Sequence, residues 1–226
     1  MTDKPIQMRP RTESREVRRK QLIEATIEVI ADNGLSGTTM ALVTQRAKVS
    51  MGLVSFHFKS KENLLHETLI YLAEEHRACW KEKLAGSALS PKAKLAAVID
   101  AHFHESTCSD QRIRVWFAFF SEPKYRECYR THISDFDEER SQVVAEQCAA
   151  LMAGKDHHFK DANEIATNIE SLADGLWLSI MLYPDELTRA DAKRQMQAYL
   201  TSVLPVQFTS WPVDEGIEMP RLETGT

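Results

Sequence analysis

Long apolar runs and leader-like segments are missing from this sequence. No stretch of about 18 consecutive apolar residues occurs, so we expect neither a transmembrane helix nor a membrane partner. The N-terminal segment, MTDKPIQMRPRTESREVRRK, is polar and basic, and it has no apolar core of the kind that a secretory signal needs. These absences predict a cytoplasmic protein.

Closely spaced cysteines are also missing. The four cysteines lie far apart and form no Cys-x-x-Cys pair, which argues against a zinc ribbon and against a thioredoxin-like redox motif. Isolated cysteines are consistent with a reducing cytoplasm. They are Cys79, Cys108, Cys128 and Cys148.

Glycine and proline are scarce, with eight of each in 226 residues. This scarcity disfavours a turn-rich β protein and favours long helices. The chain is 43% hydrophobic and 27% charged, which is the balance of a soluble globular protein. Its length allows one large domain or two small ones.

Motifs of the common enzyme classes are absent as well. There is no glycine-rich phosphate loop, no Gly-x-Ser-x-Gly elbow and no repeated Glu-x-x-His triplet of a di-iron bundle. The one histidine-rich stretch, His102-x-His104-Glu105, places residues two apart on different faces of a helix, where they are poor joint ligands. We therefore assign no catalytic residue, no cofactor and no metal ligand, and we expect no enzyme activity.

Charge is present, but it is unevenly distributed. The net charge is −5, yet residues 1–61 hold eleven Lys and Arg against six Asp and Glu, which leaves this part at +5 and the remainder at −10. A basic N-terminal region on an acidic body indicates that one region meets a polyanion and the other does not. A basic leader without a partner is the alternative explanation.

Apolar spacing and capping residues predict an all-α fold of about nine helices with no strand. Ser or Thr stands before many of these helices as an N-cap. The residues expected to end helices are Gly34, Pro123, Gly154, Pro184 and Pro205. The first expected helix begins at Thr12 or Ser14 and ends at Asn33-Gly34. The other eight span 40–47, 51–57, 61–84, 91–106, 110 to Pro123, 134–152, 161–182 and 188–204. The acidic tail 205–226 has no assigned role, although Phe208 and Trp211 are candidates to pack it against the body.

Residues 39–57 have the helix, three-residue turn, helix arrangement of a helix-turn-helix. The first of the two helices is expected to pack through Leu42, Val43 and Ala47. The second is short, and its exposed residues can enter the major groove of DNA. Phe56 and Phe58 cannot both face inward on a helix, and we expect Phe58 to be the buried one.

The segment TTMALVTQRAKVSMGLVSFHFKSKENLL resembles the N-terminal signature of the TetR family of bacterial transcription repressors. The similarity covers roughly residues 14–70. It implies a helix-turn-helix head over 12–60, joined by a long fourth helix to a helical domain for ligand binding and dimerisation over 61–204. The last two helices, 161–182 and 188–204, would then pair in a homodimer.

The resemblance also implies a set of DNA-binding residues. Ser50, Met51, Gly52, Ser55, Phe56 and His57 would lie at the groove, and Thr39 and Lys61 at phosphates. Thr39 and Lys61 both stand at helix starts, where free N–H groups suit an anion. Two positions depart from the family pattern. Lys48 replaces the usual glycine of the turn and would reach a phosphate, and Phe56-His57 replaces paired tyrosines.

Three further segments resemble the BetI-like, choline-responsive branch of this family. They are VSFHF at 54–58, WFAFF at 116–120 and LADGLWL at 172–178. The resemblance implies a repressor of glycine betaine synthesis genes that binds an inverted-repeat operator in double-stranded DNA and is released by choline or a related effector. A quaternary ammonium is held by aromatic faces, often beside a carboxylate. The candidate ligand-binding residues are Trp116, Phe119, Phe120, Asp174 and Trp177.

Two alternatives keep the DNA-binding head but change the effector. In one, the ligand is bulky and apolar, with Met181, Phe119 and Trp177 as its wall. In the other, the aromatic residues are ordinary core and the protein has no small-molecule ligand, with Asp174-Gly175 serving a helix contact. A cavity lined by aromatic residues would favour a sensor, and a carboxylate facing it would favour a cation.

Overall fold

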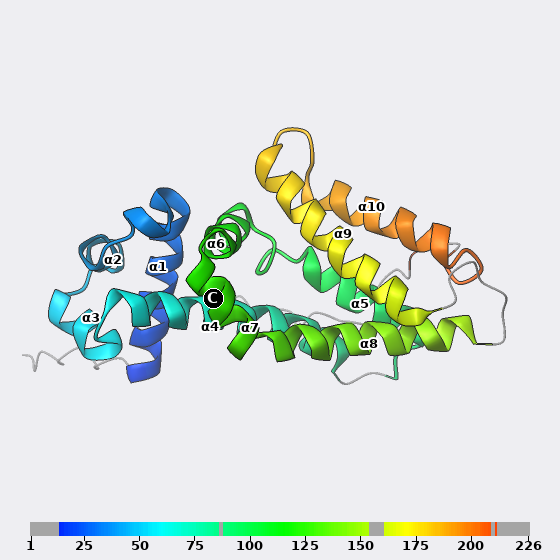
Figure 1. Ribbon diagram of the computed structural model, residues 1–226, viewed down its shortest axis with the longest axis horizontal. Coiled ribbons are helices and arrows are strands. Elements are labelled where there is room, and N and C mark those ends of the chain that lie inside the picture. The colour runs from blue at the N-terminus through cyan, green and yellow to red at the C-terminus, as the bar shows by residue number, and fades with distance from the viewer. Residues whose placement is uncertain (1–13, 86–87, 154–160, 209–210, 212–226) are drawn as a thin grey trace, which may run out of the picture.

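The computed structural model describes residues 14–85, 88–153, 161–208 and 211, which form ten α-helices and no strand (Figure 1). Every one of the nine expected helices is present, which confirms the all-α prediction. The tenth, α7, was not expected. The helices are α1 (Arg15–Gly37), α2 (Met40–Ala47), α3 (Met51–Phe58), α4 (Lys61–Leu84), α5 (Pro91–His102), α6 (Asp110–Ser121), α7 (Pro123–His132), α8 (Ser134–Met152), α9 (Ala162–Leu182) and α10 (Arg189–Val203).

The unexpected helix results from the double role of a proline. Pro123 does end α6, as predicted, but it also occupies the first turn of α7. Proline is tolerated there because its missing N–H would have no partner in the helix anyway. A second boundary was also wrong. Helix α5 ends at His102 instead of near Ser106, and the Thr107 hydroxyl donates to the Ala101 carbonyl at 2.6 Å just beyond that end.

The head consists of α1, α2 and α3, packed around side chains that are fully buried. Val43 from α2 and Val54 and Phe58 from α3 have no exposed surface. Gly34 interrupts α1 with φ 69° and ψ 173°, a conformation open mainly to glycine, which confirms the predicted stop. Lys48 ends α2 in the left-handed region, with φ 54° and ψ 45°.

The long helix α4 extends from the head along the base of the body (Figure 1). It packs against α5, and α5 and α9 pack against α8, while α10 lies beside α9. Apolar side chains of α4 at positions 64, 65, 69 and 72 face the common core. None of the helices within the described ranges combines the length and the apolar character needed to cross a membrane.

The predicted contact of the C-terminal segment with the body is present. The Phe208 side chain is buried, and its ring lies 5.7 Å from that of Trp211. Gln207 donates from its side chain to the Leu151 carbonyl at 2.6 Å. The start of the predicted acidic tail is therefore part of the body, and residues 212–226 lie outside the described part.

A buried arginine joins the head to the body. The Arg112 guanidinium on α6 lies 2.9 Å from a carboxylate oxygen of Glu24 on α1 and 2.9 Å from one of Glu75 on α4. The Tyr71 hydroxyl on α4 donates to the same Glu24 carboxylate at 2.7 Å. Three helices from two parts of the molecule thus share one ion-pair cluster.

Replacing Arg112 with Met is expected to lower the free energy of unfolding by about 3 kcal/mol, because two partly buried carboxylates lose their common cation. Arg114→Met is the matched control. Arg114 is exposed on the same helix, and among the described residues its ion-pair partner is Asp110, so its loss should change stability by no more than about 0.5 kcal/mol. Urea unfolding followed by circular dichroism measures both. Equal effects of the two substitutions would contradict a structural role for Arg112.

Candidate functional site

The exposed face of α3 carries four of the residues expected at the DNA groove. Met51, Gly52, Ser55 and Phe56 are all exposed, with 67% of the Phe56 surface open to solvent. His57 is half-buried, and Phe58 faces the core as expected. An exposed phenylalanine on a short helix leaves apolar surface without cover, which favours a partner there.

Helix starts position the two hydroxyl residues of this surface. Thr39 is the N-cap of α2 and accepts from the Leu42 N–H at 3.2 Å. Ser50 is the N-cap of α3 and accepts from the Leu53 N–H at 3.3 Å. In both cases the hydroxyl hydrogen stays available for donation, beside the free N–H groups of a helix N-terminus.

Two exposed lysines flank α3, and both have a positive φ. Lys48 precedes α3 with φ 54°, and Lys59 follows it with φ 59°. A non-glycine residue rarely adopts such a conformation, and its retention commonly marks a functional constraint. Lys48 was among the predicted residues. Lys59 was not, although a lysine directly after the second helix of the predicted helix-turn-helix is a signal that the sequence contained.

Lys61 is held more firmly than a freely mobile phosphate contact would be. Its ammonium donates to the Leu35 carbonyl near the end of α1 at 3.0 Å. Two of its three donors remain for a phosphate. Lys61 therefore both closes the head against α4 and keeps hydrogen-bonding capacity toward the outside.

The His57 ring lies beside the basic first turns of α1. Its neighbour Phe56 is 5.2 Å away in an edge-to-face arrangement, and the Arg15 guanidinium is 5.9 Å from the Phe56 ring centroid. Partial burial, Arg15 and Arg19 lower the pKa of His57, so the imidazole is neutral at neutral pH. Arg9 and Arg11, which contribute to the charge of the basic N-terminal region, lie outside the described residues.

Gly52 is not required by the packing of the head. A methyl group built at Gly52 would meet only the Ser50 hydroxyl oxygen, at 4.0 Å. The glycine also lies inside a helix, where it costs about 0.5–1 kcal/mol relative to alanine. Its presence is therefore best explained by something that approaches α3 closely from outside.

A second candidate site lies in the body, as an open cavity of about 410 Å³ lined by residues of helices α4 to α9. This volume is within the range of small-molecule sites. The lining combines aromatic rings with a large share of charged groups. The aromatic residues of the lining are Trp116, Phe120, Tyr129, Phe136 and Trp177, and the charged ones are Arg77, Asp137, Glu138, Arg140, Glu170 and Asp174.

Three of the rings form one wall. Trp116 and Phe120 are stacked with centroids 5.5 Å apart, and Tyr129 contacts both edge-to-face at 6.0 and 5.4 Å. Trp177 approaches from α9, and its indole N–H donates to the His102 carbonyl at 2.9 Å. This hydrogen bond fixes the orientation of the Trp177 ring at the cavity.

The floor of the cavity contains a buried ion pair. Arg140 donates to both carboxylate oxygens of Glu170, the closest contact being 2.6 Å, and it also reaches Asp137 at 2.9 Å. Burial alone would raise the pKa of Glu170, but His102 and Arg140 hold it far below its ordinary value. Glu170 is therefore ionised, and its charge is already neutralised by protein groups.

Asp174 differs from Glu170 because it has no such partner. No hydrogen bond or ion pair to Asp174 occurs within the described ranges, and its side chain is exposed at the edge of the cavity. Partial desolvation and the nearby Glu170 carboxylate raise the pKa of Asp174. A carboxylate in this position would gain most from a bound cation.

The structure thus places four of the five expected ligand residues at one cavity and leaves one out. Trp116, Phe120, Asp174 and Trp177 line it. Phe119 does not, because it is completely buried on another face of α6, with its ring 5.1 Å from that of Tyr125. Gly175 has open space around it, so no close contact with another helix in the described part of the chain requires it. Sequence reasoning missed Tyr129, His76 and Arg140, which come from helices other than α6 and α9.

Known proteins match both parts of the chain. Residues 22–68 match the family described as bacterial regulatory proteins, tetR family, and residues 91–205 match the family described as BetI-type transcriptional repressor, C-terminal. The HTH-type transcriptional regulator BetI of Burkholderia mallei (strain NCTC 10229) is 33% identical over 199 residues, which cover 86% of this chain and 97% of that protein.

Solved structures share the fold. A transcriptional regulator from Pseudomonas aeruginosa PAO1 is 21% identical and superposes with a TM-score of 0.69, covering 89% of this chain and 97% of its own. A regulator from Saccharomonospora viridis, solved in complex with choline, is 18% identical with a TM-score of 0.66, covering 82% and 96% of the two chains. Profile, sequence and fold agree, and the chain belongs to the TetR family of DNA-binding transcription regulators, with a C-terminal domain of the BetI type.

Proposed function

We propose that this regulator binds an inverted-repeat operator as a homodimer, represses genes of glycine betaine synthesis, and is released by choline or a closely related quaternary ammonium. The observation that carries the choice of effector is the unpaired Asp174 carboxylate at the edge of an aromatic cavity. Because the operator is chromosomal DNA, the site of action is the cytoplasm.

Quaternary ammonium groups cannot donate hydrogen bonds, so proteins hold them by aromatic faces and by charge. Trp116, Phe120, Tyr129 and Trp177 supply the faces. Asp174 supplies the charge that Glu170, already paired with Arg140, does not. The choline complex of the Saccharomonospora viridis relative shows that this fold accommodates such a ligand.

A histidine offers a donor for the other end of choline. Burial, Arg140 and His102 hold the pKa of His76 well below its ordinary value, so its ring is neutral. Its Nδ1 lies 3.5 Å from an Arg140 nitrogen that can only donate, which assigns the ring proton to Nε2. That buried Nε2 has no partner among the described residues. Less than 1 Å² of this atom is accessible, so a hydroxyl oxygen of the ligand would reach it only after neighbouring side chains move.

The same lining disfavours the two alternative effector hypotheses. Of the proposed apolar wall, only Trp177 lines the cavity, while Phe119 and Met181 do not. Six charged side chains surround the space, which is unfavourable for a bulky apolar ligand. The presence of the cavity argues against the hypothesis that the aromatic residues are ordinary core and that the protein has no small-molecule ligand.

Helix α4 connects the cavity to the DNA-binding head. Ala73, His76 and Arg77 line the cavity, and Lys61 at the start of the same helix contacts the end of α1. A ligand that binds one arrangement of α4 more tightly shifts the population toward it. The spacing of two heads in a dimer would then depart from the roughly 34 Å that successive half-sites require.

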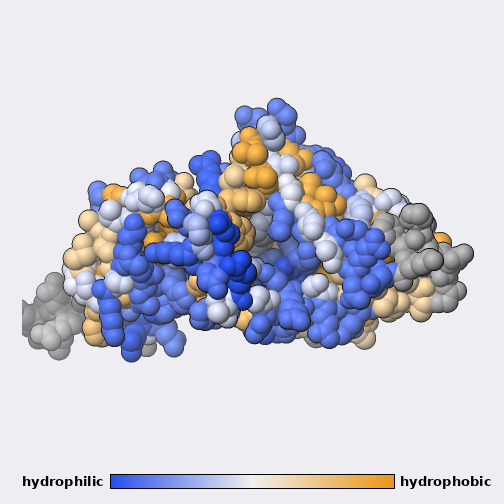
Figure 2. Space-filling model, in the orientation of Figure 1, coloured by the Kyte–Doolittle hydropathy of each residue, from blue (hydrophilic) through white to orange (hydrophobic). Residues whose placement is uncertain are grey.

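The dimer interface is proposed on α9 and α10. Leu178 and Leu182 are one helical turn apart on α9 and exposed, and Tyr183 follows directly after that helix. Hydrophobic surface gathers over the end of α9 at the top of the molecule (Figure 2). Apolar side chains exposed in neighbouring positions favour a protein partner, and a second copy completes a two-headed DNA reader.

Choline at a hundredfold excess over its Kd should stabilise the folded protein by about 2.7 kcal/mol, which raises Tm by roughly 5–10 °C. Asp174→Asn should abolish most of that shift, because it removes the charge and keeps the shape. Asp185→Asn, an exposed carboxylate outside the cavity, is the matched control. Thermal unfolding at several choline concentrations measures all three proteins.

Analogues of choline separate the contributions of the cavity. The uncharged isostere with carbon in place of nitrogen should bind far more weakly than choline, and tetramethylammonium, which lacks the hydroxyl, should bind with intermediate affinity. Tighter binding of the uncharged isostere than of choline would contradict the proposal that the cavity binds a cation. The DNA-binding function would be unaffected by that outcome.

Gly52→Ala should leave the head folded, with stability equal or higher by about 0.5–1 kcal/mol, yet weaken operator binding roughly tenfold, a loss of about 1.4 kcal/mol. The added methyl group meets little in the protein but would meet DNA. The probe is a duplex selected by the unaltered protein from a random library, and binding is followed by fluorescence anisotropy.

Lys48→Gly serves as the comparison on the same duplex. It removes a charge and relieves a positive φ, so it should lower the slope of log affinity against log salt by about 1 per head. Unaltered operator affinity in Gly52→Ala would contradict close approach of DNA to α3.

A Leu178→Glu and Leu182→Glu double variant should be monomeric and should lose most operator affinity, because like charges would face each other across the two-fold axis. Val206→Glu is the control, since Val206 is an apolar residue outside α9 that is more exposed than either leucine. Analytical ultracentrifugation reports the oligomeric state. A dimer that persists in the double variant would place the interface elsewhere.

A further inference from the structure

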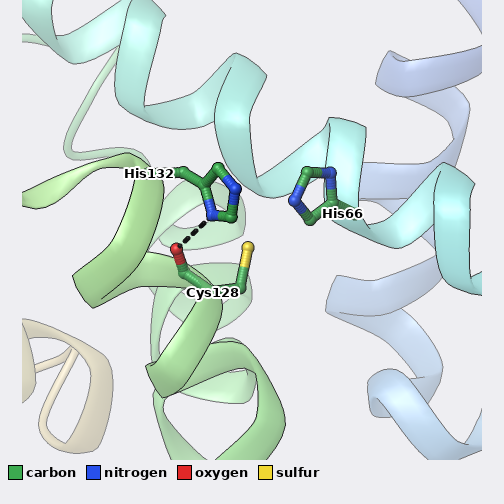
Figure 3. A group of neighbouring side chains, drawn as sticks. All are labelled: His66, Cys128 and His132. Carbon is green, nitrogen blue, oxygen red and sulfur yellow. Dashed lines mark hydrogen bonds between the residues drawn. The ribbon is translucent and has the colours of Figure 1, made fainter.

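Three potential metal ligands gather between α4 and α7, outside both sites described above. His66 comes from α4, and Cys128 and His132 come from α7 (Figure 3). One ligand atom from each lies within 4.8 Å of the other two. Cys128 and His132 are four residues apart and so project from the same face of their helix.

The side chains point toward a common space. In Figure 3 a ring nitrogen of His66 and one of His132 face each other, and the Cys128 sulfur points toward the gap between the two rings. The rings are 5.5 Å apart, centroid to centroid, in an edge-to-face arrangement. The packing of two imidazoles alone does not require a thiol at their meeting point.

One of the histidines is already oriented for metal binding. The Nδ1 atom of His132 lies 3.2 Å from the Cys128 carbonyl oxygen, which places the ring proton on Nδ1 and leaves Nε2 with its lone pair. Metal-binding histidines typically donate their other ring N–H to a carbonyl or carboxylate in this way.

The dimensions suit a small tetrahedral ion. Zn²⁺ binds sulfur at about 2.3 Å and nitrogen at about 2.0–2.1 Å, which sets its ligand atoms roughly 3.3–3.6 Å apart. Side-chain rotations would have to shorten the distances between the ligand atoms, which are at most 4.8 Å, by up to about 1.5 Å. His66 and Cys128 are half-buried and His132 is exposed, so an ion can reach the site from solvent.

We propose that His66, Cys128 and His132 form a binding site for Zn²⁺ or a similar thiophilic divalent cation, with water in the fourth position. Thiolate and imidazole ligands are the set that such ions prefer over Mg²⁺ or Ca²⁺. Sequence analysis assigned no metal ligand, because His66 is distant in the chain from the other two and α7 itself was not expected.

The site lies between the two parts of the regulator. His66 stands on α4 between Lys61, which contacts the head, and Ala73, which lines the cavity. Tyr129 on α7 and Ile133, just after the end of α7, line the cavity and directly follow Cys128 and His132 in sequence. A bound ion would fix α7 against α4, and thereby the cavity wall against the helix that continues into the head.

Cobalt titration of the metal-free, full-length protein under a non-chelating reductant tests the proposal. One equivalent of Co²⁺ per chain should give a thiolate-to-cobalt charge-transfer band and intense tetrahedral d–d bands, both displaced by Zn²⁺. Cys128→Ser should abolish the charge-transfer band. His66→Gln and His132→Gln should weaken Zn²⁺ binding by about a hundredfold or more in competition with a chromophoric chelator.

Two controls keep the result specific to this cluster. Cys79→Ser removes a half-buried thiol elsewhere on α4 and should leave the spectrum unchanged. A His157→Gln and His158→Gln double variant removes paired histidines that lie outside the described residues, and it should bind as the unaltered protein does. Absence of a charge-transfer band, or its survival in Cys128→Ser, would overturn the proposal, as would loss of binding in either control.

Discussion

The ion pairs of the Arg112 guanidinium are the contacts on which the architecture depends most. The guanidinium is buried, and it pairs with Glu24 from the head and with Glu75 from the long helix that leaves the head. A buried charge that loses a partner is costly, so the three helices involved favour one mutual arrangement. The ion pairs of Arg112 therefore hold α1, α4 and α6 together where the head meets the body.

The cavity follows a related electrostatic pattern with a different outcome. Arg140 neutralises Glu170 and Asp137 and so makes the burial of acidic groups tolerable. It leaves Asp174 unpaired beside the aromatic wall. A site that binds a cation needs both features, because a fully paired cavity offers no charge and an unpaired buried cluster would not fold. The difference between Glu170 and Asp174, one helical turn apart on α9, decides which carboxylate is available.

Much of the fold could be predicted from the sequence because its signals are local. Thr39, Ser50 and Ser60 are N-caps as expected, since a cap bonds to a backbone N–H only three residues away. Gly34 interrupts the helical backbone of α1 for a reason intrinsic to one residue. The burial of Phe58 and the exposure of Phe56 followed from helical geometry over three positions. The helix-turn-helix was readable for the same reason.

Sites built from distant residues could be predicted only in part. Phe119 and Phe120 are adjacent and chemically alike, yet only the packing of α6 against α7 places Phe120 at the cavity and Phe119 in the core. Pro123 was predicted only to end α6, but it also occupies the first turn of α7. The sequence by itself determined nine of the ten helices in the described ranges and the caps Thr39, Ser50 and Ser60, because each depends on neighbours within a few residues. Only the tertiary structure decided which charges remain unpaired and which ligands meet, because convergence depends on contacts between residues far apart in the chain.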